Sequence, residues 1–98
     1  MRTIYKYNVP GSIKGPIVRF LQPHMQNGEM KIWAELDDRL EEKEYYVLDA
    51  GTGWLVEPED ELYEFMEHGM YCGTVMDGCW VWHVYVIETH RLKNLESS

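Results

Sequence analysis

Residues 71–87 constrain the fold most, because they form two β-rich segments joined by Asp77-Gly78. An Asp-Gly pair between β-branched and aromatic residues is typical of a type I′ hairpin turn, whose two central residues need positive φ. With these two residues at the turn, the predicted register pairs Met76 with Cys79, Thr74 with Val81, Cys72 with His83, Val75 with Trp80, and Gly73 with Trp82. Large apolar groups occur on both faces, which places residues 80–87 at the centre of a small curled sheet.

A second hairpin is predicted at Asn27-Gly28, which separates residues 17–26 from residues 29–37. In this register the side chains sort into two faces. The apolar face carries Leu21, Met25, Met30, Ile32, Ala34 and Leu36, and the polar face carries Gln22, His24, Gln26, Glu29, Lys31 and Glu35. Phe20 and Trp33 also fall on the polar face, with Trp33 opposite Gln22. Because Pro23 cannot donate a ladder hydrogen bond, residues 17–26 are predicted to form an edge strand or to contain a bulge.

Two further strands and one helix complete the predicted elements. Residues 3–9 alternate as a strand that ends at Pro10-Gly11, and residues 43–50 form another strand that ends at the turn of residues 51–53. Residues 58–67 are expected to form a short helix, with acidic residues in its first turn and Gly69 as its stop. Residues 91–98 are polar and are expected to fray.

These elements indicate a mainly β fold, with α+β possible, in one domain over residues 1–90. Two hairpins, five to six strands and one short helix favour an antiparallel sheet curled into a half-barrel or a two-layer sandwich. An open sheet covered by the helix is the alternative. A chain of 98 residues has room for one modest core.

The apolar runs are all too short to span a membrane, and the first residues do not form a signal-peptide core. A cytoplasmic protein is therefore expected, as a monomer or a small homo-oligomer. In the predicted register Cys72 and Cys79 lie too far apart for a disulfide bridge, so free thiols are expected.

The formal net charge of −8 disfavours direct binding to nucleic acids or to anionic membranes, because phosphate contacts need clustered Lys and Arg. The acidic residues concentrate in two segments, residues 35–44 and residues 57–67. Such segments are compatible with a basic protein partner or with simple solubility.

The candidate catalytic pair is Cys72 and His83, because residues opposed across a hairpin have Cβ atoms about 5 Å apart. Two residues that simply pack in the strands are the more economical explanation. A metal site could be assembled from Cys72, Cys79, His68, His83 and His90, but the close ligand pairs typical of zinc sites do not occur. Neither a metal nor any other cofactor is expected.

Several segments together resemble a family of small proteins common in phage and prophage genomes. They are Thr3-Ile-Tyr-Lys-Tyr, Gln26-Asn-Gly, Ile32-Trp-Ala-Glu-Leu-Asp, Gly51-Thr-Gly, Gly73-Thr-Val and Trp82-His-Val. The resemblance covers about residues 3–87 and implies a viral or prophage origin. It implies no chemistry, because that family carries no established activity.

Three functions remain possible at this point. The first is a non-enzymatic phage or prophage accessory protein that binds a basic host protein and, in a stronger form of the hypothesis, inhibits it. The residues expected to contact this partner are Glu57, Asp60, Glu61, Glu64, Asp37, Asp38, Trp33 and Trp54. The second is a small-ligand or nucleotide-binding domain whose aromatic pocket contains Tyr5, Tyr7, Trp80 and Trp82. The third is an enzyme that uses Cys72 and His83.

Overall fold

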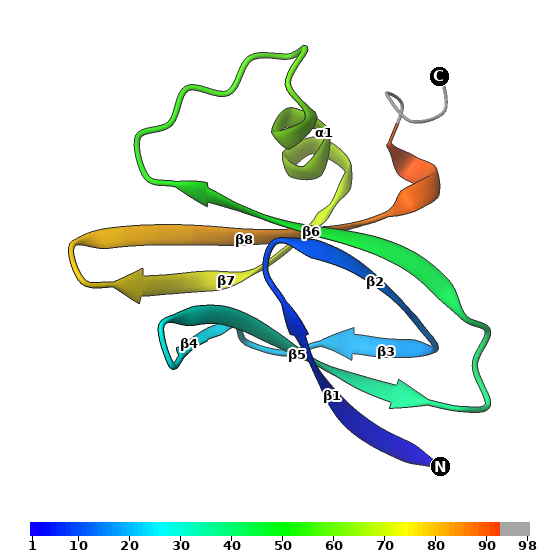
Figure 1. Cartoon of the computed structure of the whole chain (residues 1–98). Coiled ribbons are helices and arrows are strands. Elements are labelled where there is room, and N and C mark those ends of the chain that lie inside the picture. Colours follow the sequence, from blue (N-terminus) through cyan, green and yellow to red (C-terminus); the bar gives the residue numbers. More distant parts are fainter. Residues whose placement is uncertain (93–98) are drawn as a thin grey trace.

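The computed structural model describes residues 1–92, which form eight β-strands, one α-helix and a 3₁₀ turn (Figure 1). The strands are β1 (Arg2–Asn8), β2 (Gly11–Gly15), β3 (Ile17–Phe20), β4 (His24–Gln26), β5 (Glu29–Asp37), β6 (Lys43–Gly51), β7 (Met70–Asp77) and β8 (Trp80–Glu88). The helices are α1 (Glu61–His68) and η1 (Thr89–Arg91). The predicted mainly β fold with one short α-helix is confirmed, although the strands number eight rather than five or six.

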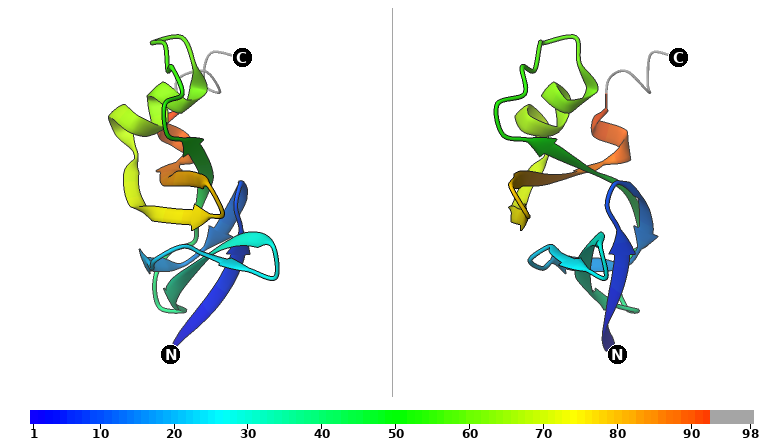
Figure 2. Two further views of the ribbon diagram at one scale, coloured as in Figure 1. Left: turned by 90° about the vertical axis from the view of Figure 1, so that its left-hand side faces the viewer. Right: turned by 60° about the vertical axis from the view of Figure 1, so that its left-hand side comes forward.

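The strands form two antiparallel sheets of four strands each. In the N-sheet, β5 pairs with β1 on one side and with β3 and β4 on the other, whereas the C-sheet has the order β2-β6-β8-β7. The two open sheets lie over each other, and α1 lies on the side of the C-sheet that faces away from the N-sheet (Figure 2). The predicted central position of residues 80–87 is confirmed, because β8 lies between β6 and β7.

The main core lies between the sheets and combines Ile13, Ile32, Val47, Val84 and Val86 with their neighbours. A second cluster on the other side of the C-sheet joins Phe65 of α1 to Ile87 and Leu92. Leu92 is fully buried, so the packed part of the chain continues past residue 90. Of the tail predicted to fray, residues 93–98 lie outside the described residues.

Strand β2 has no counterpart among the predicted elements. Its sequence, Gly-Ser-Ile-Lys-Gly, has low strand propensity, because glycine is disfavoured in strands. It is a strand because it pairs with β6, from Gly11 opposite Val47 to Gly15 opposite Lys43, and because Ile13 is buried in the core. Tertiary pairing outweighs local propensity here.

The hairpin at Asn27-Gly28 is confirmed. Asn27 and Gly28 have φ of 53° and 80°, as a type I′ turn requires, and Met25 pairs with Met30. The predicted apolar face of β5 is also confirmed, since its four members are buried: Met30, Ile32, Ala34 and Leu36.

The predicted strand over residues 17–26 divides at Pro23 into β3 and β4. The register changes by one residue across this break, so the Leu21 N–H donates to the Trp33 carbonyl at 2.7 Å. Phe20 then lies opposite Ala34 and packs edge-on against Tyr45 in the core, with ring centroids 5.2 Å apart. The predicted position of Phe20 on the polar face, and of Trp33 opposite Gln22, is therefore wrong. The prediction of an edge strand interrupted at Pro23 is confirmed.

The β7–β8 hairpin turns one residue later than predicted. Its turn residues are Gly78 and Cys79, so Asp77 pairs with Trp80, Val75 with Trp82 and Thr74 with His83. Gly78 has φ of 62°, whereas Cys79 is not among the described residues with positive φ. This is the type II′ arrangement, with glycine at the first central position, rather than type I′.

Cys72 lies at a bulge in β7, where the register shifts between Tyr71 and Gly73. Gly73 has φ of 153°, and a Cβ atom added to it would lie 2.5 Å from Nε2 of Gln22, in the segment that joins β3 to β4. The bulge thus needs glycine both for its backbone conformation and for the close approach of the two sheets.

Helix α1 begins at Glu61, three residues after the predicted start, and ends before Gly69 as predicted. Phe65 is fully buried, and Leu62 packs partly against the same cluster, but Met66 is exposed. The apolar face of the helix therefore consists of Phe65 and Leu62 and does not include Met66.

Candidate functional site

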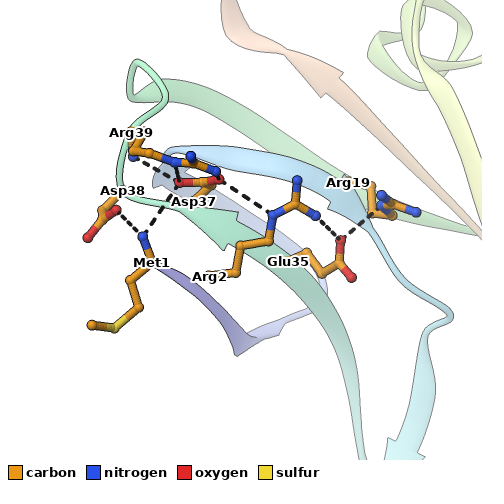
Figure 3. Close-up of polar contacts among 7 residues, drawn as sticks. All are labelled: Met1, Arg2, Arg19, Glu35, Asp37, Asp38 and Arg39. Carbon is orange, nitrogen blue, oxygen red and sulfur yellow. Dashed lines mark hydrogen bonds and ion pairs between the residues drawn. The ribbon is translucent and has the colours of Figure 1, made fainter.

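Three carboxylates of the first acidic segment, those of Glu35, Asp37 and Asp38, are paired with bases within the described chain (Figure 3). The carboxylate of Asp37, only 4% exposed, accepts hydrogen bonds from Nε and Nη2 of Arg39 at 3.0 and 2.7 Å. These bonds hold the pKa of Asp37 well below its ordinary value. Asp37 is therefore a structural ion-pair residue, and its buried carboxylate has little surface left with which to contact a partner.

The same ion-pair network extends across three strands of the N-sheet (Figure 3). Arg2 of β1 lies 3.5 Å from Asp37 and 3.9 Å from Glu35, and Arg19 of β3 lies 2.9 Å from Glu35. The amino group of Met1 lies 2.7 Å from Asp38. Asp38 is exposed but paired, so residues 35–38 present little free negative charge to a partner. The later carboxylates of this segment, those of Glu41, Glu42 and Glu44, are exposed and take part in no ion pair among residues 1–92.

In the second acidic segment most of the carboxylates are exposed and unpaired. Among residues 1–92 no ion pair involves any of Glu57, Glu59, Asp60, Glu61 and Glu67. Asp60 instead accepts a hydrogen bond from the Glu57 N–H at 2.9 Å, which orders the loop before α1. Free negative charge thus lies on this loop and on the first turn of α1, as well as on Glu41, Glu42 and Glu44.

Glu64 does not belong to this exposed group. Its side chain is 14% exposed, and its Oε2 atom lies 3.6 Å from Nε2 of His68 one helical turn later. Glu64, named with Glu57 and Glu61 as a candidate partner contact, is therefore turned toward the protein by α1, whereas Glu57 and Glu61 are exposed.

Trp54 and Leu55 lie in the same loop as these carboxylates, and 53% and 89% of their surfaces are exposed. The Trp54 indole rests on Gly51, where an added Cβ atom would lie 2.6 Å from Nε1. The absence of a side chain at Gly51 therefore fixes the place of the indole, while Leu55 projects into solvent. We call Trp54, Leu55, Glu57, Glu59, Asp60 and Glu61 the acidic loop.

Two tryptophans of β8 continue the aromatic surface from Trp54. The Trp54 and Trp82 ring centroids are 5.6 Å apart at 87°, and those of Trp82 and Trp80 are 6.0 Å apart at 21°. We call these three residues the tryptophan array. The spacing of Trp80 and Trp82 by two residues already indicates one face of a strand. The addition of Trp54 depends on the path of the loop, which no sequence pattern indicates.

The predicted aromatic pocket is not assembled as one site. Tyr5 and Tyr7 line a separate open hollow of about 480 Å³ with Lys14, Pro16 and Leu36, far in sequence from the tryptophans. Trp33, predicted like Trp54 to contact a partner, is half-buried on the N-sheet and packs edge-on against His24, with ring centroids 6.1 Å apart. The predicted aromatic residues therefore fall into three places.

The predicted pairing of Cys72 with His83 is wrong, because Cys72 lies at the bulge and Thr74 is opposite His83. Nε2 and Nδ1 of His83 lie 2.7 and 3.1 Å from the hydroxyls of Thr52 and Thr74. Burial raises the pKa of the Cys72 thiol to about 11, which opposes formation of a nucleophilic thiolate. The arrangement thus lacks an activated cysteine nucleophile.

The histidines proposed as metal ligands are dispersed. His68 faces Glu64, and His90 lies 3.1 Å from Glu88. Within residues 1–92 no three His, Cys, Asp or Glu side chains are grouped as metal ligands would be, and no helix is long and apolar enough to cross a membrane.

Residues 1–94 match the model of a protein family described as a domain of unknown function, DUF7352. The chain therefore belongs to the DUF7352 family. No curated protein and no solved structure matches it.

Proposed function

We propose that this protein is a non-enzymatic interaction module that binds a protein with a basic surface through the acidic loop and the tryptophan array. The observation that carries the proposal is the combination of unpaired carboxylates with exposed apolar side chains in the acidic loop. The carboxylates of Glu35 and Asp37 are neutralised by Arg2, Arg19 and Arg39. The acidic loop instead surrounds exposed Trp54 and Leu55 with carboxylates that take part in no ion pair among residues 1–92.

Electrostatics supports a basic partner. The net charge of −8 gives a negative field that attracts a positively charged surface and speeds its encounter. Carboxylates held on a loop ordered by the Asp60 hydrogen bond and on a helix need little reordering when they bind.

The exposed aromatic groups supply the apolar part of such an interface. Tryptophan is enriched among residues that dominate binding energy, and polar neighbours around it exclude water when the interface closes. Trp54 and Leu55 are placed to act as anchors, with Glu57 and Glu59 next to them in the chain.

The resemblance to small phage and prophage proteins supports a host protein as the partner, met in the host cytoplasm. A rigid set of carboxylates can occupy a groove that otherwise takes phosphate groups, and the bound module then inhibits its partner by competition.

The proposal is tested by two triple variants that change the net charge equally. Glu57→Gln/Glu59→Gln/Glu61→Gln alters the acidic loop, and Glu41→Gln/Glu42→Gln/Glu44→Gln alters exposed carboxylates elsewhere. Immobilised wild-type and variant proteins are compared for capture of basic proteins from bacterial lysate, at low and high salt. We expect the first variant to lose capture and the second to keep it. Equal capture by all three proteins, or equal loss in both variants, would contradict a site at the acidic loop.

The hollow beside Tyr5 and Tyr7 favours a second candidate function, the binding of a small ligand. Its volume of about 480 Å³ lies in the range of small-molecule sites, and Lys14 provides a cation at its wall. Screening small aromatic acids by NMR tests this candidate. Shifts confined to Tyr5, Tyr7 and Lys14, and lost in Tyr5→Ala, would support it, whereas shifts scattered over the surface would not.

A further inference from the structure

The tip of the β7–β8 hairpin places a carboxylate beside an exposed indole. Asp77 and Trp80 are directly opposed as the last pair before the two-residue turn, so their side chains leave the same face of the C-sheet. Opposed residues have Cβ atoms about 5 Å apart, so the two side chains are near neighbours. Both are exposed, and 59% of the Trp80 surface is open.

The second ring of the tryptophan array determines which side of Trp80 is open. Trp82 lies beside Trp80 in an offset stack, with an interplanar angle of 21° and a centroid distance of 6.0 Å, so it covers part of one face of the Trp80 indole. The large exposed surface therefore belongs mainly to the opposite face and the outer edge. Stacking on Trp82 holds the ring in place, which leaves a fixed flat surface at the hairpin tip.

The carboxylate at this tip has no cationic partner within the protein. Among residues 1–92 no Lys, Arg or His nitrogen lies within ion-pair distance of Asp77. Asp49, on the same face of the C-sheet, is likewise outside any ion pair in this part of the chain. An open indole face with an unpaired carboxylate at its side is complementary to a planar cation.

We propose that the open face of Trp80 and the carboxylate of Asp77 form a slot for the guanidinium group of an arginine side chain. The guanidinium stacks on the indole and donates hydrogen bonds to the carboxylate. This inference rests on the proposed function, because the arginine would belong to the basic partner. It adds the residue type that the tryptophan array recognises.

Arginine fits this slot better than lysine or a nucleobase. Its guanidinium is planar and can stack and donate two parallel hydrogen bonds at once, whereas an ammonium is a compact, strongly hydrated charge. A phosphate-bearing ligand would be repelled by Asp77 and by the net charge of −8.

The slot is tested by NMR titration of the ¹⁵N-labelled protein with Nα-acetyl-arginine-N′-methylamide. The lysine analogue and the uncharged citrulline analogue serve as comparison ligands. We expect saturable shifts of the Trp80 indole N–H and the Asp77 amide with arginine, weaker shifts with lysine and none with citrulline. In Trp80→Leu and in Asp77→Asn the arginine affinity should fall about two- to fivefold, the upper range of an exposed cation–π contact and of an exposed ion pair. The control Glu67→Gln removes an exposed carboxylate from α1 and should leave the affinity unchanged.

Equal shifts with citrulline or lysine, or equal affinity in wild type and both slot variants, would overturn the arginine assignment. This failure is separable from failure of the proposed function. Loss of partner capture in the acidic-loop variant without a response to the arginine probe would retain the interaction module and remove the slot. A specific response to the probe, combined with partner capture that the acidic-loop variant does not alter, would retain the slot and remove the acidic loop as a partner-binding site.

Discussion

The hydroxyl oxygen of Thr74 lies 3.1 Å from Nδ1 of His83, its direct partner across the β7–β8 hairpin. The same hydroxyl forms a short hydrogen bond with the Tyr71 phenol, and the other ring nitrogen of His83 lies 2.7 Å from the Thr52 hydroxyl. His83 thereby links β7 to the turn after β6. Both of its nitrogens are engaged in holding this face of the C-sheet.

Thr74→Val keeps the shape of the side chain but removes the hydroxyl, so His83 and Tyr71 both lose a partner. We expect the free energy of unfolding in urea to fall by about 1 kcal/mol, the usual net value of a hydrogen bond. Thr74→Ser retains a hydroxyl and should lose less. A Thr74→Val protein as stable as wild type would show that the hydroxyl contributes nothing to stability.

The type II′ turn predicts opposite effects for two neighbouring residues. Gly78 has positive φ, so Gly78→Val should lower the free energy of unfolding by about 1 to 2 kcal/mol. Asp77 ends a strand, where a β-branched residue is favoured, so Asp77→Val should change stability by less than about 0.5 kcal/mol. In the type I′ turn predicted from the sequence, Asp77 would need positive φ and both variants would be destabilised. Thermal and urea unfolding of the two variants distinguish the turns.

This one-residue difference shows where sequence reasoning reaches its limit. Asn27-Gly28 and Asp77-Gly78 carry equivalent turn signals, yet only the first forms the two-residue turn in which both members are central. At the second site, the bulge at Cys72 and the contact of Gly73 with Gln22 set the position of β7. Long-range contacts therefore select the register, and a local signal cannot report them.

The candidate site shows the same division. The exposed acids of residues 57–61 and the common face of Trp80 and Trp82 follow from sequence pattern. The pairing of Asp37 with Arg39 and Arg2 does not, because it depends on strand order and on the path of a turn. The sequence identifies where charge is abundant, but the structure decides which of that charge is already neutralised.

The buried Asp37 predicts a specific response to acid. Arg39 lowers the pKa of Asp37 in the folded protein, so this stabilisation is complete above the ordinary carboxyl pKa of about 4. It is lost only as the pH falls below that value, through the lowered folded pKa. Asp37→Asn should reduce stability at pH 7 and show a flatter acid-unfolding profile than wild type. Asp38→Asn, at an exposed site, should have a smaller effect on the stability at pH 7 and on the acid-unfolding profile. Identical profiles for Asp37→Asn and wild type would contradict a stabilising ion pair.

The two free cysteines should differ in reactivity. With a pKa of about 11, the Cys72 thiol is almost fully protonated at neutral pH, and only the thiolate reacts with iodoacetamide. We expect slow labelling of Cys72 in the Cys79→Ser variant, with a rate that rises about tenfold per pH unit between pH 8 and 10. Cys79 is exposed and should label faster in Cys72→Ser. Mass spectrometry measures the labelling. Rapid labelling of Cys72 at pH 7 would indicate an activated thiolate and revive the enzymatic hypothesis.

Leu92 follows η1 and packs with Phe65 and Ile87 on the side of the C-sheet that carries α1, so it contributes to holding the helix in place. Because it is fully buried, Leu92→Ala should lower the free energy of unfolding by about 2 to 4 kcal/mol through the lost apolar burial and the cavity that remains. The matched control is Leu55→Ala, the same substitution at an exposed position of the acidic loop, which should change stability by less than about 0.5 kcal/mol. Hydrogen exchange adds a local measurement, since the Leu92 variant should lose protection mainly in α1 and the end of β8. If both substitutions have the same small effect, residues after β8 do not contribute to the packed domain and its boundary lies near residue 90.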